Sequence, residues 1–468
     1  MPPADATLPQ ATPRTSSLES VRLCGWGGGD RVQAQLIRPE RLEDLPAALE
    51  LIHHRAPHQA IPRGMGRSYG DAAQLVGGIV LETTHLKGFE LDAERGTVTA
   101  SAGVSLAELL ERLVPAGWML PVLAGTQHVS VGGAIAGDIH GKSHGADGTF
   151  GAHVEELELL TSSGELRRLT PEREGFSATL GGMGLTGVIA SARIRLRRVG
   201  SALLSVDCDR VDDLDHALAA LDAPGGRYRV AWLDLLGSHP GRGVVTRADH
   251  LPAEAAPPDR DGHATVPGRA TVPARATVPR WWPGLVLRPS AVHAYNELRF
   301  RRTPRRRRGR VESIGEHMFP LDALTSWPRL YGARGFIQYQ LVVPRGAERA
   351  LQVVIERLRA ARIPTYLAVL KDFGDANGAP LSFPIAGWTL ALDIPRSVPR
   401  LYEVLDGLDD LVAQAGGRVY LSKDSRMRPE ALAAMYPRLD EWRAARDRLD
   451  PERVWRSDLA TRTRLVGG

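Results

Sequence analysis

IPRGMGRSYGDAA, residues 61–73, is the stretch of the sequence that decides its fold class. Gly64, Gly66 and Gly70 form a pattern similar to the dinucleotide-binding fingerprint of Rossmann folds. That fingerprint requires a crossover helix directly after its last glycine. The next strand-like run, GGIVLE, begins at Gly77 and leaves no room for such a helix. The sequence therefore disfavours a Rossmann fold.

Two other interpretations of this loop are open. Its glycines can serve an ordinary tight turn, because glycine most often satisfies backbone geometry. Alternatively, its successive backbone N–H groups, flanked by Arg63, Arg67, Ser68 and Tyr69, can form a concave site for pyrophosphate oxygens. The rest of the sequence has to decide between them.

A second glycine-rich run, GTQHVSVGGAIAGDIHGKSHG at residues 125–145, holds six glycines and three histidines. Residues without a Cβ allow the backbone to approach a flat ligand closely. His140 can be a core histidine, but its place between Asp138 and Lys142 favours a side chain that faces a ligand. A third cluster, GGMGLTGVI at residues 181–189, leads into a strand. Together the three runs favour the binding interpretation.

The pattern of apolar residues along the chain predicts an α+β fold of two domains, which suits a length of 468 residues. Short strands alternate with helices as far as about residue 196, and longer strands such as GFIQYQLVVP and GWTLALDIP follow. We predict a disordered tail over 1–17, a first domain over 18–200 and a second over 201–416. Residues 417–468 form a segment that returns to the first domain.

The composition limits the classes of site and location that need to be considered. Cys24 and Cys208 match no disulfide or metal-ligand spacing, so we expect two buried thiols and no metal site. The first twenty residues lack the apolar core of a signal peptide, and no apolar run is long enough for a membrane span. Any membrane association is therefore expected to be peripheral, with the side of the membrane left open.

A low-complexity excursion, predicted as a mobile loop over about 253–311, interrupts the second domain. It contains the unit ATVP three times and then the run RFRRTPRRRRGR at residues 299–310. The arginine run can be a solvated loop, a site that docks on anionic lipid or, less favoured, a nucleic-acid contact. No interleaved aromatic residues or recognition helix accompany it, so we expect no nucleic-acid partner.

Lysine is rare in this chain, and its few positions are therefore informative. Only Lys87, Lys142, Lys371 and Lys423 occur among 59 basic residues, so arginine supplies the generic positive charge. Lysine has a compact ammonium group whose pKa moves readily on burial, which the guanidinium cannot match. We expect some of these lysines to have a specific chemical role.

Six motifs in this order resemble the decaprenylphosphoryl-β-D-ribose 2'-oxidases, a family of the vanillyl-alcohol-oxidase flavoprotein superfamily. They are RGMGRSYGD, GTQHVSVGGAIAGDIHGKSHG, GGMGLTGVI, GFIQYQ, APLSFPIAGW and YLSKDSR, and the similarity runs from about residue 23 to 465. The resemblance implies a two-domain PCMH-type FAD-binding fold, whose substrate domain is an antiparallel sheet with flanking helices. Covalent members often carry histidine where this chain has Arg67, so non-covalent FAD is implied.

The resemblance also implies an FAD shell, carried over position by position. Its expected members are Pro62, Arg63, Gly64, Met65, Gly66, Arg67, Ser68, Tyr69, Gly70, Asp71, Ala72, Gly125, Ser130, Val131, Gly132, Gly133, Gly137, Asp138, Ile139, His140, Ile189 and Tyr420.

Strand alternation offers a wall for the substrate beside this shell. Gln338 and Gln340 share one strand face, which is either solvated or a hydrogen-bonding wall. The resemblance places that strand along the substrate cavity. The expected substrate residues are Lys142, Met318, Gln338, Gln340, Lys371, Phe373, Thr389, Ala391 and Lys423.

In the family, the 2'-hydroxyl carbon of a polyprenylphosphoryl ribose is oxidised to a ketone. A partner NAD(P)H-dependent keto-reductase then completes the epimerisation to an arabinose donor for cell-wall arabinan. We expect Lys423 and His140 to be catalytic, with Lys423 as the base if burial or a neighbour such as Arg426 lowers its pKa. Lys423 can instead bind the substrate phosphate, the contact expected of Lys142 and Lys371 together with the sugar.

Three positions depart from the family's pattern. Ala391 stands where mycobacterial members carry a cysteine, Thr389 where they carry asparagine, and Met318 where they carry tyrosine. Oxidation by a flavin does not need that thiol, so we expect turnover to be retained. Covalent inhibitors that react with the thiol should not act on this chain. The other two differences leave open the sugar and the lipid. The alternatives are therefore a sugar-lactone or alditol oxidase acting on a free polyol, and a catalytically silent binding protein for flavin or prenyl phosphate.

Overall fold

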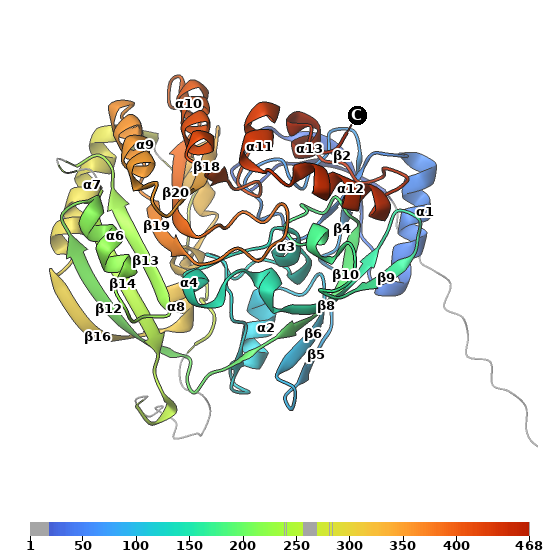
Figure 1. Cartoon of the computed structure of the whole chain (residues 1–468), viewed down its shortest axis with the longest axis horizontal. Helices are drawn as coiled ribbons and strands as arrows, with labels where there is room; N and C mark the ends of the chain where they lie inside the picture. Colours follow the sequence, from blue (N-terminus) through green and yellow to red (C-terminus); the bar gives the residue numbers. More distant parts are fainter. Residues whose placement is uncertain are drawn as a thin grey trace, which may run out of the picture.

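A computed structural model describes residues 18–237, 239, 241–255, 269–279, 281–282 and 284–467 of the chain. The tail predicted over residues 1–17 lies outside the described residues. Figure 1 shows one large sheet on the left and smaller sheets on the right, with helices of the carboxyl-terminal third along the top. The fold is α+β with two domains, as the sequence predicts.

The first domain contains a mixed four-stranded sheet and an antiparallel five-stranded sheet. The four-stranded sheet has the order β1 (Glu19–Leu23), β2 (Val32–Ile37), β4 (Ile79–Glu82) and β3 (Ala60–Arg63). The five-stranded sheet has the order β5 (Phe89–Asp92), β6 (Thr97–Ser101), β10 (Val188–Arg195), β8 (Val154–Leu160) and β9 (Leu166–Leu169). A small ribbon joins β7 (Trp118–Met119) to β11 (Arg197–Arg198).

The second domain is built on an antiparallel eight-stranded sheet, helped by a short parallel pair, β15 (Ala276–Thr277) and β17 (Leu324–Thr325). The order is β16 (Arg306–Ser313), β12 (Leu203–Val211), β14 (Arg242–His250), β13 (Tyr228–Asp234), β19 (Ala368–Phe373), β20 (Gly387–Pro395), β18 (Phe336–Pro344) and β21 (Arg418–Val419). Almost every residue of β18 is buried, because both faces of the sheet are covered there.

Helices α6 (Leu214–Asp222), α9 (Glu348–Ala360) and α10 (Leu401–Gln414) cover one face of this sheet (Figure 1). Their buried leucines, valines and isoleucines recur at helical spacing and join the main hydrophobic core. The opposite face is turned toward the glycine-rich loops of the first domain, since its side chains line a cavity together with them. The sheet therefore forms one wall of the site.

The remaining helices belong to the first domain, to the carboxyl-terminal segment and, for α7 and α8, to the second domain. Their bounds are α1 (Leu45–Arg55), α2 (Leu106–Leu113), α3 (Val131–Ala136), α4 (His144–Asp147), α5 (Phe176–Thr179), α7 (Pro289–Arg302), α8 (Ile314–Met318), α11 (Pro429–Met435), α12 (Leu439–Leu449) and α13 (Asp458–Thr463). Helix α2 begins with a capping box, in which Ser105 and Glu108 satisfy each other's backbone N–H groups. No described helix is long and apolar enough to cross a membrane.

The expectation of a mobile loop over 253–311 is wrong for the later part of that segment. The arginine run completes helix α7 and begins edge strand β16. This strand pairs with β12, where Asp207 and Asp209 form ion pairs with Arg308. The composition of the arginine run does not reveal its partners on β12, so the sequence analysis wrongly predicted a mobile loop. Residues 256–268 lie outside the described residues.

The second and third ATVP units are partly buried against the rest of the protein, which an extended surface loop would not be. Val272 and Val278, from the second and third units, are buried. The side chain of Gln127 donates to the backbone carbonyl of Val272 and accepts from its N–H group, which ties this segment to the second glycine-rich run. The first unit lies in the part of the chain that is not described.

The carboxyl-terminal segment leaves the large sheet and contacts the first domain. Strand β21 still pairs with β18, so the large sheet extends to Val419. Arg462 of α13 then forms a two-point ion pair with Asp71 and a further one with Asp424. These contacts join the end of the chain to the first glycine-rich loop.

Candidate active site

A cavity of about 570 Å³ lies between the glycine-rich loops and the inner face of the eight-stranded sheet. Both loops, the turn after β21 and strands β13, β18, β19 and β20 contribute to its lining. The predicted cofactor residues that line it are Pro62, Arg63, Gly64, Met65, Gly66, Arg67, Ser68, Tyr69, Ala72, Gly125, Ser130, Gly132, Gly133, Gly137, Ile139, His140, Ile189 and Tyr420.

The first loop presents a run of free backbone donors. Within the described chain, the N–H groups of residues 64–68 donate no hydrogen bond to another part of the protein. Gly66 adopts a φ of 63°, which curves the backbone around them. Arg63 braces the loop from behind, because its guanidinium donates to the carbonyls of Ala73 and Cys24. Such a concave set of N–H groups is suited to the oxygens of a pyrophosphate.

The second loop packs tightly against the first. Ser130 caps helix α3 by accepting from the N–H of Gly133, and its Oγ lies only 2.2 Å from where a Cβ on Gly64 would stand. Gly125 differs, because a Cβ there would meet no atom of another described residue within 4 Å, its two chain neighbours aside. The glycines therefore serve two purposes: some let the loops meet, and Gly125 opens toward the cavity.

Four predicted cofactor residues do not line the cavity but support it. Val131 is a core residue of α3. Asp138, fully buried, accepts from the side chains of Asn377 and Ser382 and from the Gly151 N–H. Gly70 allows close approach of the Asp424 carbonyl, where a Cβ would lie 1.6 Å away, and Asp71 pairs with Arg462. These four residues therefore support the loops from behind and do not line the cavity.

Most predicted substrate residues lie on the cavity wall. Those that line it are Lys142, Met318, Gln338, Gln340, Lys371, Ala391 and Lys423. Gln338 and Gln340 are buried, so their strand face is a hydrogen-bonding wall and not a solvated surface. Two predictions differ: Phe373 packs edge-on against the ring of His140, and Thr389 hydrogen-bonds Gln340 and the Leu341 carbonyl. Neither lines the cavity.

Lys423 lies in the turn after β21, directly over an aromatic ring. Its Nζ is 3.8 Å from the centroid of Tyr69, and burial lowers its pKa to about 7. The positive charge of Lys371 lowers this pKa further, whereas the carboxylate of Asp393 opposes the shift. A large fraction of Lys423 is therefore a neutral amine near neutral pH, which is the form that can accept a proton.

Arg426, suggested from the sequence as the neighbour that lowers the pKa of Lys423, has another role. Its guanidinium forms ion pairs with Asp406 and Asp409 of helix α10. Lys371 is the cation that acts on Lys423 instead.

Lys142 and Lys371 provide two more buried amines. Burial lowers the pKa of Lys142 to about 7 and that of Lys371 to about 8, because removing an ammonium group from water disfavours its charged form. The Nζ of Lys142 donates to the backbone carbonyl of His317, while the Nζ of Lys371 lies 5.8 Å from the centroid of Phe373. An anion bound beside them would stabilise both charged forms.

His140 is held as a neutral ring in one tautomer. Its Nε2 faces the amide nitrogen of Gln340 at 2.8 Å, and an amide nitrogen can only donate. The Nε2 must therefore accept, so the proton sits on Nδ1, which is buried without a partner among the described residues. Burial holds the pKa of His140 well below its usual value. His140 thus fixes the amide of Gln340 on the cavity wall through its Nε2.

Two further residues at the site escaped the sequence analysis. Asp393 lies across from Gln338, whose amide nitrogen donates to it at 2.6 Å, and burial raises its pKa to about 7. Strand alternation places Asp393 on the face of Ala391, so the signal was present in the sequence. Trp232 lines the cavity from β13, and no local motif marks it.

The residues present fit FAD. The free N–H groups of the first loop match a pyrophosphate, and the small residues of α3 leave the cavity open beside them. The amides of Gln338 and Gln340 supply polar groups on the wall where a flavin ring and a sugar can meet. At position 67 the chain has no histidine for covalent attachment but an arginine, whose guanidinium carbon lies 3.9 Å from the ring centroid of Trp26.

Comparison with known proteins agrees with this geometry. Residues 33–170 match the family model of an FAD binding domain, and residues 395–463 match that of D-arabinono-1,4-lactone oxidase. The chain is 37% identical over 464 residues to the decaprenylphosphoryl-β-D-ribose oxidase of Mycolicibacterium smegmatis, covering 95% of this chain and 98% of that protein. An uncharacterised protein of Streptomyces coelicolor is 39% identical over 376 residues, covering 77% and 100%. An alditol oxidase of a Streptomyces species is 28% identical over only 180 residues.

Proposed function

This chain belongs to the decaprenylphosphoryl-β-D-ribose oxidase family of FAD-dependent oxidoreductases, and from that premise we propose that it oxidises a polyprenylphosphoryl-β-D-ribose at its 2'-hydroxyl. The product is the 2'-ketone. The observation that carries the proposal is the placement of a buried amine of lowered pKa, Lys423, in the same cavity as the cradle for FAD.

The site needs a hydride acceptor and a proton acceptor for this reaction. FAD, when bound, supplies the hydride acceptor for the C2' hydrogen. Lys423 in its neutral form takes the proton of the 2'-hydroxyl as the C–H bond breaks, and becomes an ammonium beside Asp393. The carboxylate then stabilises the charge that has just formed, in a site where water is largely excluded.

The other wall residues orient the substrate. Gln338 and Gln340 offer amide groups to the ribose hydroxyls, and His140 holds the amide of Gln340 in position. Lys142 and Lys371 bind the phosphate, whose negative charge keeps both amines protonated. This division of roles leaves Lys423 as the neutral base.

Two partners follow from the proposal. A 2'-ketone on a lipid-linked pentose requires an NAD(P)H-dependent keto-reductase to complete an epimerisation, and the arabinose product suits cell-wall arabinan synthesis. The prenyl tail resides in a bilayer, so we propose peripheral contact of this chain with the membrane or cell envelope.

The proposal is tested by anaerobic mixing of the purified, flavin-loaded protein with three donors while the absorbance of bound FAD is followed. The donors are a farnesylphosphoryl-β-D-ribose, a free alditol and an aldonolactone, the last two chosen because of the shorter matches to alditol and lactone oxidases. We expect bleaching by the lipid-linked ribose alone. Bleaching only by the alditol or the lactone would overturn the proposal, and no bleaching by any donor would favour a silent binding protein.

A further inference from the structure

We propose that Arg299 and Arg307, with Tyr295 and Leu298 beside them, form a docking site for the anionic headgroups of a phospholipid bilayer. The site lies at the outer end of the active-site cavity. This inference rests on the proposed function, because it identifies where the prenyl tail of the substrate passes from the bilayer into the protein.

The cavity extends well beyond its reactive end. The same hollow that is lined by Lys423 and Gln340 also reaches Arg299 on α7 and Arg307 on β16. Outside it lies a second hollow of about 400 Å³, lined by residues of α7 and of the turn and strand that follow. Arg299 and Arg307 are the residues that both hollows share, so they stand at the passage between them.

The strand order gives the length of this passage. Lys371 is on β19 and Arg307 on β16, and strands β13, β14 and β12 lie between them. Four strand intervals of ~4.8 Å separate the two side chains by about 19 Å across the sheet. The floor between them is largely apolar, with Val230, Trp232 and Val244 on the cavity side.

The chemistry of the substrate excludes its own phosphate from the outer site. In a ribosyl 1-phosphate, the phosphate oxygen is bonded to C1', the neighbour of the carbon that is oxidised. When C2' lies beside Lys423, the phosphate must lie close by, within reach of Lys142 and Lys371. The apolar floor then suits the prenyl tail, and the arginines at its far end are left for a different anion.

The charges at the outer end are available for such an anion. Residues 299–310 contain eight arginines and no acidic residue. Arg301, Arg308 and Arg310 each form an ion pair with a carboxylate, but in the described part of the chain Arg299 and Arg307 form none within 4.0 Å.

The two guanidinium groups have different surroundings. That of Arg299 lies 4.2 Å from the centroid of Trp232, whereas the buried Nε of Arg307 has no hydrogen-bond partner among the described residues. Glu312 lines the cavity as well, yet its carboxylate contacts Arg310 and His317. Among the described residues, Glu312 is thus a longer-range electrostatic partner of Arg307, and no carboxylate forms a direct ion pair with either arginine.

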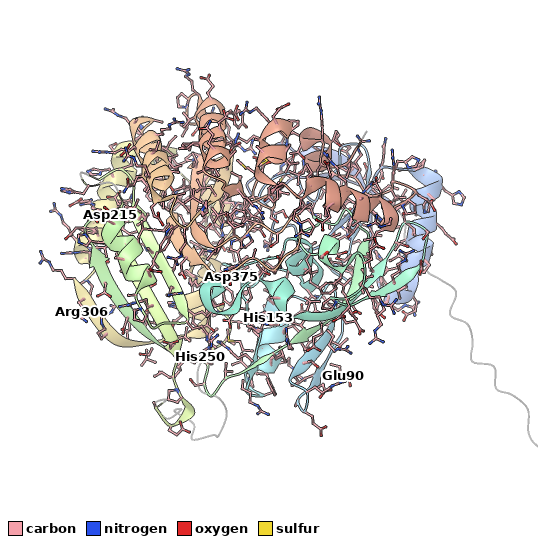
Figure 2. The ribbon with its side chains drawn as sticks, in the orientation of Figure 1. Glu90, His153, Asp215, His250, Arg306 and Asp375 are labelled. Carbon is pink, nitrogen blue, oxygen red and sulfur yellow. The ribbon has the colours of Figure 1, made fainter. Side chains whose placement is uncertain are left out.

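The surroundings of the pair match a bilayer interface better than a soluble anion. Tyr295 and Leu298 on α7 are 49% and 48% exposed at the second hollow. An exposed tyrosine and leucine among arginines suit the boundary between headgroups and acyl chains. Figure 2 shows Arg306, the first residue of β16, at the outer margin of the molecule, on the side away from the first domain.

Vesicle flotation of the full-length, flavin-loaded protein without substrate tests the proposal. The probes are vesicles of phosphatidylcholine alone and of phosphatidylcholine with phosphatidylglycerol. We expect binding to the anionic vesicles, and about thirtyfold weaker partitioning for Arg299→Gln/Arg307→Gln, at about 1 kcal/mol for each arginine. The control Arg349→Gln/Arg359→Gln, on α9, removes the same charge from the helix-covered face of the sheet and should bind like the parent protein. Flavin content and melting temperature show whether each variant has folded.

Three results would overturn the proposal. The first is vesicle binding by Arg299→Gln/Arg307→Gln that equals that of the control. The second is a raised KM of Arg299→Gln/Arg307→Gln for a short-chain substrate in free solution, while this variant still binds vesicles. That result would place the substrate phosphate at these arginines. The third is displacement from vesicles by millimolar inorganic phosphate or by a DNA oligomer. Flotation uses no substrate, so vesicle binding can be interpreted even if the protein does not catalyse the proposed oxidation.

Discussion

At the scale of single residues, the site separates groups of similar chemistry by their surroundings. Three buried lysines have pKa values lowered to between about 7 and about 8, and each has different neighbours. Lys423 lies over Tyr69 and is influenced by Asp393, whereas Lys142 donates to a backbone carbonyl. A carboxylate acts on each of the three amines, so the feature that sets Lys423 apart is its contact with the ring of Tyr69, a residue of the first glycine-rich loop.

Replacing Lys423 with Ala should remove the proton acceptor and keep the cofactor. We expect kcat to fall by about 10²–10⁴, the usual contribution of a general base. Bound flavin should persist, because the free N–H groups that would hold it belong to residues 64–68. Lys87→Ala is the matched control, since Lys87 is an exposed lysine paired with Glu108. Near-normal turnover of Lys423→Ala would rule out this role.

The pH dependence of kcat should report the same amine, because the bound phosphate keeps Lys142 and Lys371 protonated in the substrate complex. The neutral form of Lys423 is the active one, and its pKa is lowered to about 7. Activity should therefore rise with pH below about 7 and level off above it. A profile that falls as pH rises through 7 would show that the ammonium is the active form, and would assign Lys423 to phosphate binding.

His140 should position the amide of Gln340 and should not titrate in the working range. Burial keeps its pKa well below the usual value, so the ring is neutral throughout. His140→Asn should lower kcat by about tenfold, the worth of one hydrogen bond, without moving the midpoint of the pH profile. A shifted midpoint would mean that His140, rather than Lys423, carries the titrating proton.

At the scale of elements, the two glycine-rich loops act as one unit because their backbones meet. A Cβ on Gly64 would lie 2.2 Å from the Oγ of Ser130, the residue that caps α3. Ser130 cannot retreat without losing that cap. Gly125 has open space around it, so only a bound ligand can restrict it.

Gly64→Ala and Gly125→Ala should therefore separate loop packing from cofactor contact. We expect Gly64→Ala to lower both the melting temperature of the protein and its flavin content. Gly125→Ala should leave the melting temperature of the flavin-free protein unchanged and lower only the affinity for FAD. Flavin-to-protein ratios and thermal melts measure both quantities. Equal melting temperatures for the two flavin-free variants would contradict this account of the loops.

The sequence analysis succeeded where local chemistry was sufficient and failed where pairing decided the structure. Glycine spacing and strand alternation identified the loops and the wall of Gln338 and Gln340. The arginine run was misjudged because its order depends on Asp207 and Asp209 of a distant strand. The influence of Asp393 on Lys423 likewise depends on how a distant turn packs against the sheet, which no local pattern contains.

At the scale of the whole molecule, the end of the chain fastens the cofactor loop to the turn that carries Lys423. Arg462 contacts Asp71 after the first glycine-rich loop and Asp424 next to Lys423. Its guanidinium also donates to the carbonyl of Met427. One side chain of α13 thus contacts two segments that are remote in the sequence, the first glycine-rich loop and the turn after β21, and so joins the cofactor cradle to the turn that carries the base.

Arg462→Met should loosen this connection. Removal of one partner from a largely buried ion-pair network costs about 3 kcal/mol, so we expect a lower melting temperature together with reduced flavin retention. Arg428→Met is the control, because Arg428 forms an exposed pair with Asp410 that contributes little. Similar melting temperatures for the two variants would show that the carboxyl-terminal contact is not structural.

The central claim, oxidation at C2' of a lipid-linked ribose, is tested most directly with a substrate that carries deuterium at C2'. The flavin-loaded protein is mixed with it without oxygen, and the bleaching of bound FAD is timed against the unlabelled substrate. The account predicts slower bleaching with the labelled substrate and a 2'-ketone from which the deuterium has been lost. Equal bleaching rates together with a product that retains the deuterium would contradict it.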